Sequence, residues 1–370
     1  GTIWPSEATE EDHVTGEAGS KAAGMFAAFD AKFLSFIVLA TLVAVVAQPY
    51  PNVAMWVGFC FAAYAAVAND SIQTIGTFIA SNRGRPWWHL WLFMGGLMAV
   101  TLSYSWATYG GDVSYERLTS KGFENAPTEF TVLQLIAPLV LLILTRLRMP
   151  VSTTFLLLSC FAAEGKSIGA VLLKSISGYG IAFLAAILLW FTVTKLMERV
   201  LKGEPHPLWR PVQWVTSGVL WSVWLMQDAA NVAVYLPRQM TLVELLGVLV
   251  VMVGGLGWLF ATGGERIQEV VDEKSSVQDV RSATIIDFLY AGILYLFKIE
   301  GNVPMSTTWV FIGLLAGREL AISIRSSDKS LGAASRMVAR DLIYVTAGFL
   351  VSLVLAFFGN PALQSSMLGE

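Results

Sequence analysis

The stretch PVSTT at residues 150–154 recurs as PMSTT at residues 304–308. An amide and a carboxylate precede each copy, as ND at residues 69–70 and as QD at residues 227–228. The spacing from aspartate to serine is nearly equal in the two halves, 70 to 152 in one and 228 to 306 in the other. Because the same polar groups occur twice in the same order, the sequence indicates one duplicated unit.

These polar groups stand in a chain that is otherwise strongly apolar. Hydrophobic residues make up 55% of the chain, charged residues make up 14%, and the mean hydropathy is +0.62. A soluble domain carries roughly 25% charged residues, and a helix needs ~20 apolar residues to cross a bilayer. The composition therefore predicts an all-α polytopic membrane protein, a multi-pass protein in the lipid bilayer of the inner cell membrane. The longest apolar runs are 33–47, 87–107, 131–145, 178–194, 242–261 and 343–358.

The composition also argues against several other classes of protein. A net charge of −3 gives no reason to expect a nucleic-acid partner. Cys60 and Cys160 lie in apolar segments, so no disulfide framework is expected. The histidines and cysteines do not have metal-ligand spacing. Since no nucleophile–base pair is apparent either, we expect no enzymatic activity and no cofactor besides a coupling ion.

We predict eleven membrane crossings, one leading helix followed by two units of five. Because five is odd, the second unit must enter the membrane from the opposite side, as an inverted-topology repeat does in many secondary transporters. Lys and Arg concentrate in the loops that this arrangement places in the cytoplasm, which agrees with the positive-inside rule. The predicted crossings are 31–49, 53–81, 87–108, 130–147, 150–172, 175–194, 211–237, 242–262, 283–299, 304–323 and 341–359.

This arrangement divides the chain into a polar N-terminal tail (1–30), a leading transmembrane helix (31–49), repeat 1 (53–195), a cytoplasmic linker (196–210), repeat 2 (211–359) and a C-terminal tail (360–370). Four segments carry polar residues within apolar stretches and are predicted to be broken helices, namely 53–81, 150–172, 211–237 and 304–323. Trp221 and Trp224 are predicted to lie in an interfacial belt or to face lipid.

Asp70 and Asp228 are the candidate cation ligands. A carboxylate near the bilayer centre costs at least ~2.5–3.5 kcal/mol and is rarely without a role. Carboxylate and amide oxygens suit a hard cation, so we expect Na⁺ or H⁺ at each aspartate. The alternative is a helix cap or an interhelical hydrogen bond. The amides expected to assist are Asn69, Gln73, Gln227 and Asn231.

The two Ser-Thr-Thr segments are the candidate anion site. Proline is favoured in the first turn of a helix, and the backbone N–H groups that follow it form the positive end of the helix dipole. Two such helix starts with three hydroxyls each could hold a tetrahedral anion between them. The alternative is a pair of ordinary N-caps. The residues expected to bind the anion are Ser152, Thr153, Thr154, Ser306, Thr307 and Thr308.

At these residues the chain resembles the inorganic phosphate transporter (PiT) family, which includes sulfate permease relatives. That family carries a duplicated Asn-Asp-x-x-Asn element, which residues 69–73 (NDSIQ) and 227–231 (QDAAN) resemble. It also carries a duplicated Pro-x-Ser-Thr-Thr-His element, which residues 150–154 and 304–308 resemble up to the histidine. The resemblance covers roughly residues 53 to 358.

Three differences from the family stand in these motifs. Gln73 and Gln227 each take the place of an asparagine, Phe155 and Trp309 stand where the family usually has histidine, and Tyr235 replaces a proline. Longer amides and missing imidazoles bear on the anion and the coupling ion more than on the fold.

The resemblance implies a cation-coupled symporter that moves inorganic phosphate, or second to it sulfate, by alternating access. Na⁺ and H⁺ both stay open as coupling ions, with Na⁺ expected at Asp70 and Asp228. A passive anion channel and a non-transporting accessory protein are the alternatives. The oligomeric state, a homo-oligomer included, is also open.

Overall fold

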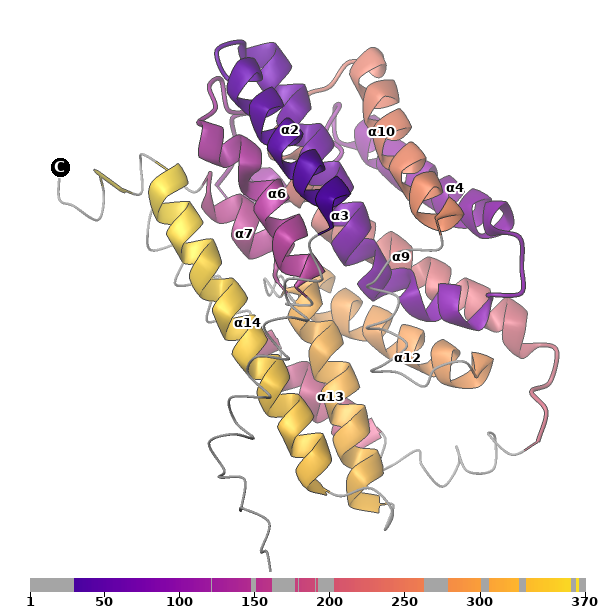
Figure 1. Ribbon diagram of the computed structural model, residues 1–370. Coiled ribbons are helices and arrows are strands. Elements are labelled where there is room, and N and C mark those ends of the chain that lie inside the picture. The colour runs from indigo at the N-terminus through magenta and orange to yellow at the C-terminus, as the bar shows by residue number, and fades with distance from the viewer. Residues whose placement is uncertain are drawn as a thin grey trace, which may run out of the picture.

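The structure is a computed structural model, and it describes residues 30–120, 122–147, 151–161, 177–178, 180–189, 191, 203–262, 279–300, 306–325, 331–360 and 364–365. Residues 1–29 of the predicted N-terminal tail, residues 196–202 of the predicted linker and most of the predicted C-terminal tail lie outside this part. In the described residues all regular structure is helical (Figure 1). The chain is thus an all-helical protein, as its composition predicts.

The structure contains the following helices in chain order. They are α2 (Ala31–Ala47), α3 (Pro51–Ser81), α4 (Trp87–Thr108), α5 (Arg117–Ser120), α6 (Val132–Arg146), α7 (Thr153–Ser159), α9 (Trp209–Ala233), α10 (Leu242–Ala261), α12 (Val280–Ile293), the π-helix η1 (Leu294–Glu300), α13 (Thr307–Arg325) and α14 (Leu331–Gly359).

Five helical stretches are long and apolar enough to cross a membrane. They are Pro51–Asp70, Trp87–Thr108, Leu242–Ala261, Val280–Phe297 and Val338–Gly359. Three further apolar helices are shorter, at Ala31–Ala47, Val132–Arg146 and Gly180–Leu189. The described residues therefore indicate a helical membrane protein.

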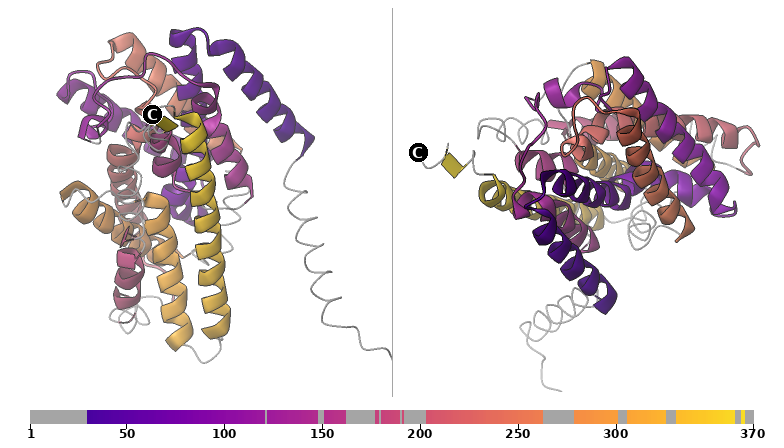
Figure 2. Two further views of the ribbon diagram at one scale, coloured as in Figure 1. Left: turned by 90° about the vertical axis from the view of Figure 1, so that its left-hand side faces the viewer. Right: turned by 90° about the horizontal axis from the view of Figure 1, so that it is seen from above.

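The outer helices carry their apolar side chains on the exposed face. Val243 and Val250 of α10 are 78% and 73% exposed, and α2 and α14 expose leucines and valines in the same way. Figure 2 shows α2 at the edge of the bundle, where it packs on α3 and α6. Such faces suit hydrocarbon, since a helix satisfies its own backbone hydrogen bonds.

Two antiparallel helices, α3 and α9, form the centre of the bundle. They pack on each other, α3 also packs on α6 and α10, and α9 also packs on α12 and α4. At one end, named here the Gly111 end, the loop at 109–131 meets the loop at 234–241. At the other, named the Asn82 end, the Asn82 side-chain amide donates to Gln213 Oε1 at 2.8 Å.

The prediction that 53–81 and 211–237 are broken helices is wrong, because α3 and α9 run through their polar residues without interruption. The polar side chains form hydrogen bonds within their own helix or with a neighbouring helix, so the backbone does not have to open. Thr74 Oγ1 donates to the Asp70 carbonyl within α3 at 3.1 Å, and Thr153 Oγ1 donates to the Asp70 carboxylate from a neighbouring helix at 2.7 Å.

The two Ser-Thr-Thr helices begin later than predicted. Helix α7 begins at Thr153 with Ser152 as its N-cap, and α13 begins at Thr307. Pro150 and Pro304 lie outside the described residues. The hydroxyl at the cap, rather than the proline ring, satisfies the start of α7.

The prediction for Trp221 and Trp224 is also wrong. Both side chains are buried, and their rings stack on each other with centroids 4.9 Å apart and planes 4° apart. Trp221 Nε1 donates to the Met94 carbonyl of α4 at 2.9 Å. The pair fills the contact between α9 and its neighbours, where the aromatic-belt rule does not apply.

The two loops at the Gly111 end are joined by backbone and guanidinium hydrogen bonds. Met240 N donates to the Gly111 carbonyl at 3.0 Å. The Arg238 guanidinium donates to the carbonyls of Phe123 at 2.8 Å and Leu236 at 2.6 Å. Burial lowers the pKa of Arg238 to about 10, and nearby Asp112 opposes this shift, so the guanidinium stays charged at neutral pH.

We expect Gly111→Ala to destabilise the fold more than Gly110→Ala. Both glycines have positive φ, +97° and +60°, but a Cβ on Gly111 would lie 2.8 Å from Met240 N, whereas one on Gly110 meets nothing within 4 Å. The control should cost about 1–2 kcal/mol from left-handed backbone strain alone, and Gly111→Ala about 2–4 kcal/mol. Thermal unfolding of the purified protein followed by tryptophan fluorescence measures the difference. Equal midpoints for the two variants would contradict a tight contact between the loops.

Candidate functional site

Two buried carboxylates face one another across the centre of the bundle. Asp70 lies in the middle of α3 and Asp228 near the C-terminal end of α9, and each is 1% exposed. Because α3 and α9 pack together, the residues predicted to bind a cation come from both halves of the chain and meet in one place.

The Asp70 carboxylate is held by an amide and a hydroxyl. Asn69 Nδ2 donates to Asp70 Oδ1 at 2.6 Å, and Thr153 Oγ1 of α7 donates to the same oxygen at 2.7 Å. The Asn69 side-chain oxygen is itself engaged, since it accepts from Gln73 Nε2 at 3.2 Å and from Thr145 Oγ1 of α6 at 3.1 Å.

The Asp228 carboxylate is held in the same manner. Thr154 Oγ1 donates to Asp228 Oδ1 at 3.2 Å, and Asn231 Nδ2 donates to that oxygen at 3.0 Å and to Thr154 Oγ1 at 2.9 Å. Two adjacent threonines at the start of α7 therefore bind carboxylates that belong to different halves of the chain.

The second Ser-Thr-Thr segment lies against the first. Thr308 Oγ1 donates to the Val151 carbonyl at 3.1 Å, and the Thr307 carbonyl accepts from the Tyr290 hydroxyl at 2.7 Å. From this shared start α7 and α13 lead toward opposite ends of the bundle (Figure 1).

The two serines act as N-caps. Ser152 Oγ accepts from Phe155 N at 3.2 Å, and Ser306 Oγ accepts from Trp309 N at 3.5 Å. The capping alternative is thus confirmed for these serines. A cap uses an oxygen lone pair and leaves the hydroxyl proton for another acceptor.

Three amide oxygens beside the carboxylates have no hydrogen-bond partner in the described part of the chain. They are Gln73 Oε1, Gln227 Oε1 and Asn231 Oδ1, and all are buried. An unsatisfied buried polar atom costs about 1–3 kcal/mol. Amide and carboxylate oxygens are the ligands of hard cations, so these residues fit a cation such as Na⁺. No group of three His, Cys, Asp or Glu residues suited to a metal ion occurs in the described residues.

The site also contains groups that the motif search missed. Arg117 of α5, which packs on α9, interacts electrostatically with Asp228; burial lowers the pKa of Arg117 and Asp228 opposes this shift. Tyr290 of α12 interacts with both Asp70 and Asp228. Neither Arg117 nor Tyr290 belongs to a repeated motif, so the search for duplicated motifs could not identify them.

A third buried carboxylate, Asp287 of α12, was also missed. It is 1% exposed and accepts hydrogen bonds from Thr77 Oγ1 and Ser217 Oγ. The sequence could have indicated it, because Asp287 is an aspartate within the apolar stretch 283–299, and a carboxylate within an apolar segment was the criterion that identified Asp70.

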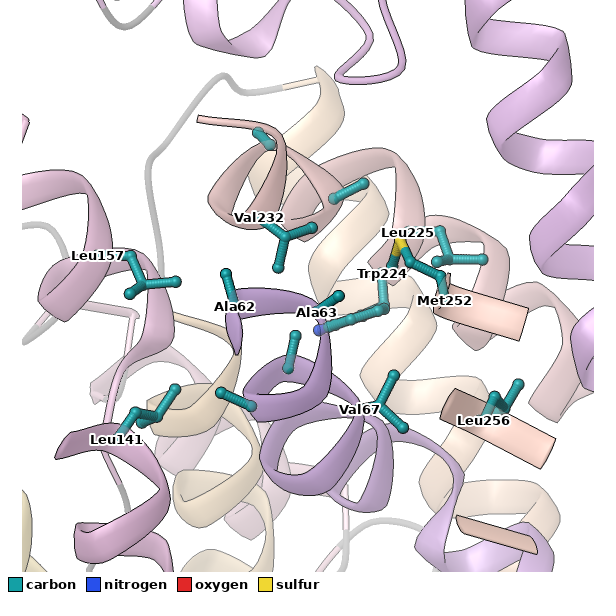
Figure 3. Close-up of a cluster of buried hydrophobic side chains, with 14 of the residues drawn as sticks. Ala62, Ala63, Val67, Leu141, Leu157, Trp224, Leu225, Val232, Met252 and Leu256 are labelled. Atoms are coloured by element: carbon teal, nitrogen blue, oxygen red, sulfur yellow. The ribbon is translucent and has the colours of Figure 1, made fainter. Parts of the chain in front are cut away.

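Apolar side chains pack around the centre of the bundle toward the Gly111 end. Figure 3 shows alanines and valines of α3 and α9 meeting leucines of neighbouring helices, with Ala62, Ala63, Val67, Leu141, Leu157, Trp224, Leu225, Val232, Met252 and Leu256 labelled. Nearer that end, a Cβ on Gly58 would lie 2.4 Å from the Tyr235 ring. The aromatic residue at position 155 belongs to the apolar packing too, since Phe155 contacts Phe349 of α14 with ring centroids 4.6 Å apart.

The arrangement therefore provides two carboxylates, three unpartnered amide oxygens and several hydroxyls in a buried place between the halves of the chain. Comparison with protein-family models, with curated proteins and with solved structures finds no match to this chain.

Proposed function

We propose that the chain is a secondary active transporter that couples Na⁺ or H⁺ to the symport of a small inorganic oxyanion, phosphate before sulfate. The observation that carries this proposal is the pair of hydrogen bonds from Thr153 to Asp70 and from Thr154 to Asp228. They bring the predicted cation ligands of both halves and two predicted anion ligands, Thr153 and Thr154, to one buried point. The resemblance to the inorganic phosphate transporter family is the reason for proposing phosphate as the transported anion.

The inverted repeat with eleven crossings is part of this proposal. Helix packing supports it, because several contacts recur when the halves are exchanged: α3–α6 corresponds to α9–α12, α4–α9 to α10–α3, and α7–α9 to α13–α3. Two further pairs, α3–α9 and α4–α10, each join an element to its own counterpart. Alternating access then consists of one repeat rocking against the other around the central site.

The hydrogen bonds suggest how cation and anion binding are coupled. In the structure, the Thr153 and Thr154 hydroxyls donate to Asp70 and Asp228. A cation bound by the carboxylates and the Gln73 and Gln227 oxygens competes for these acceptors. The threonine protons are then released toward an anion, together with those of Ser152 and Ser306, and the helix start at Thr307 and Thr308 adds its backbone dipole. The cation therefore binds first.

Uptake of labelled phosphate and labelled sulfate into proteoliposomes tests the function. We expect saturable phosphate uptake that depends on a Na⁺ or H⁺ gradient and exceeds sulfate uptake. Anion flux that is ohmic and independent of both gradients would support the channel instead. If the folded protein takes up neither anion, the result would support the alternative of a non-transporting accessory protein.

We expect Asp70→Asn and Asp228→Asn to reduce gradient-driven uptake to background. Each substitution keeps the size and most hydrogen bonds of the side chain but removes the charge that the cation needs. Asp279→Asn is the matched control, because Asp279 caps α12 outside the site and asparagine caps equally well. Uptake is compared after equal folding is verified by size-exclusion chromatography. Normal uptake by either site variant would contradict the assignment.

Thr153→Val should reduce uptake roughly 10-fold to 100-fold, whereas Thr153→Ser should stay near the parent. A hydrogen bond to a charged group contributes about 1.5–3 kcal/mol, which corresponds to this range. Valine keeps the shape and removes the hydroxyl that bonds Asp70. The cation dependence of initial rates is the measurement. If the serine and valine variants fall equally, the methyl group rather than the hydroxyl matters, and the coupling scheme is wrong.

A further inference from the structure

The third buried carboxylate, Asp287, has no part in the proposed transport site. Thr77 Oγ1 of α3 donates to Asp287 Oδ1 at 2.5 Å, and Ser217 Oγ of α9 donates to Asp287 Oδ2. Asp287 itself is on α12 and is 1% exposed. The carboxylate therefore joins the two central helices to a third one. Thr77 lies seven residues beyond Asp70 on α3, about 10 Å along the helix axis toward the Asn82 end.

No described charged side chain balances Asp287. Its interactions are burial and the two hydroxyl hydrogen bonds. Arg281 on the same helix pairs with Asp279 at 2.6 Å, and Arg318 of α13 pairs with Glu319 at 2.8 Å. The other titratable or charged residues of α12 and of the elements packed against it are Cys60, Tyr64, Asp70, Arg210, Asp228, Arg281, Tyr290, Tyr295, Lys298, Glu300, Arg318, Glu319 and Arg325. Apart from Lys298 and Arg325, whose side chains lie outside the described part, none of them forms a hydrogen bond or an ion pair with Asp287.

An isolated carboxylate in an apolar interior is costly and tends to be neutralised by a proton or a cation. The geometry favours the proton. The hydrogen-bond partners of Asp287 are two hydroxyls, whereas a hard metal cation prefers several carboxylate, amide or carbonyl oxygens. Hydroxyl groups also suit a proton site, because each can donate to the carboxylate or accept from the carboxylic acid. Thr77 and Ser217 can thus satisfy both protonation states.

A chain of buried polar groups leads from Asp287 to the Asn82 end. Ser81 Oγ donates to the Thr77 carbonyl at 2.8 Å, and Gln213 Nε2 donates to Ser81 Oγ at 2.6 Å. The Gln213 oxygen accepts from Asn82 Nδ2 at 2.8 Å, and the residues after Asn82 are exposed. Toward the Gly111 end the centre of the bundle is packed with apolar side chains instead (Figure 3). Exchange with solvent is therefore expected from the Asn82 end alone.

We propose that Asp287 is a proton-binding site that exchanges with solvent through the polar chain at the Asn82 end. In the protonated form Asp287 donates to Thr77 or Ser217, and in the ionised form it accepts from both. Protonation of Asp287 takes one proton from water, and ionisation returns that proton to water, so the exchange is balanced. The site does not depend on anion transport, so a failure of the transport proposal leaves it intact.

Infrared difference spectra of the purified full-length protein in lipid nanodiscs, recorded between acidic and alkaline pH, test the proposal. We expect a carbonyl stretching band of a buried carboxylic acid that disappears as the pH rises and is missing in Asp287→Asn. Asp279→Asn, which changes a partly exposed carboxylate, should keep the band. A band that persists in Asp287→Asn, or no titrating band in the parent, would overturn the proposal.

Thr77→Val and Ser217→Ala provide a second test that holds even where Asp287→Asn does not fold. Each removes one hydroxyl from the carboxyl group and should shift the frequency of the band without abolishing it. An unchanged band in both variants would show that it arises elsewhere. Adding NaCl at constant pH, with KCl as the control, should leave the band in place. Selective loss of the band in Na⁺ would identify a metal-cation site and overturn the assignment to a proton.

Discussion

The rest of the structure depends on the need to satisfy two carboxylates inside an apolar helix bundle. Asp70 and Asp228 are 1% exposed, and an unsatisfied charge at such depth is not tolerated. Hydrogen-bond donors come from the first two residues of α7, one threonine for each carboxylate, and from the amides of Asn69 and Asn231. A short helix that begins at the centre of the bundle is thus the means by which the two central helices can carry charge.

The position of these groups also explains why small residues line the central crossing. Ala62 and Ala63 on α3, and Ala229 and Ala230 on α9, are buried next to the polar residues. Small side chains let α3 and α9 approach closely, so that α7 reaches both carboxylates at once. The large Trp221–Trp224 stack lies farther along α9. The same crossing carries polar side chains toward the Asn82 end, among them Ser81, Asn82 and Gln213, and apolar side chains toward the Gly111 end.

Sequence reasoning located the central residues because they occur twice, and it failed where a residue acts alone. Asp287 was missed although Thr77 and Ser217 donate hydrogen bonds to it as Thr153 of α7 does to Asp70. The breaks predicted in α3 and α9 were wrong for a related reason. A motif of polar residues within an apolar segment indicates that these residues need hydrogen-bond partners. Helix packing decides whether the partners are groups of an opened backbone or side chains of a neighbouring helix. The tryptophan prediction failed in the same way, because composition alone does not say which face of α9 meets α4.

The amides beside the two carboxylates show that the duplication preserves chemistry rather than order. In the first half Asn69 precedes the aspartate and Gln73 follows it, and in the second half Gln227 precedes it and Asn231 follows. In each half the asparagine donates to the carboxylate, at 2.6 Å and 3.0 Å, and the glutamine keeps an unpartnered oxygen. The shorter amide holds the carboxylate in place, and the longer one offers an oxygen about one methylene farther from its backbone. Replacing the glutamines by the asparagines of the family pattern would withdraw these oxygens from both halves alike, so under the proposed function the choice of cation would depend on this pair of longer side chains.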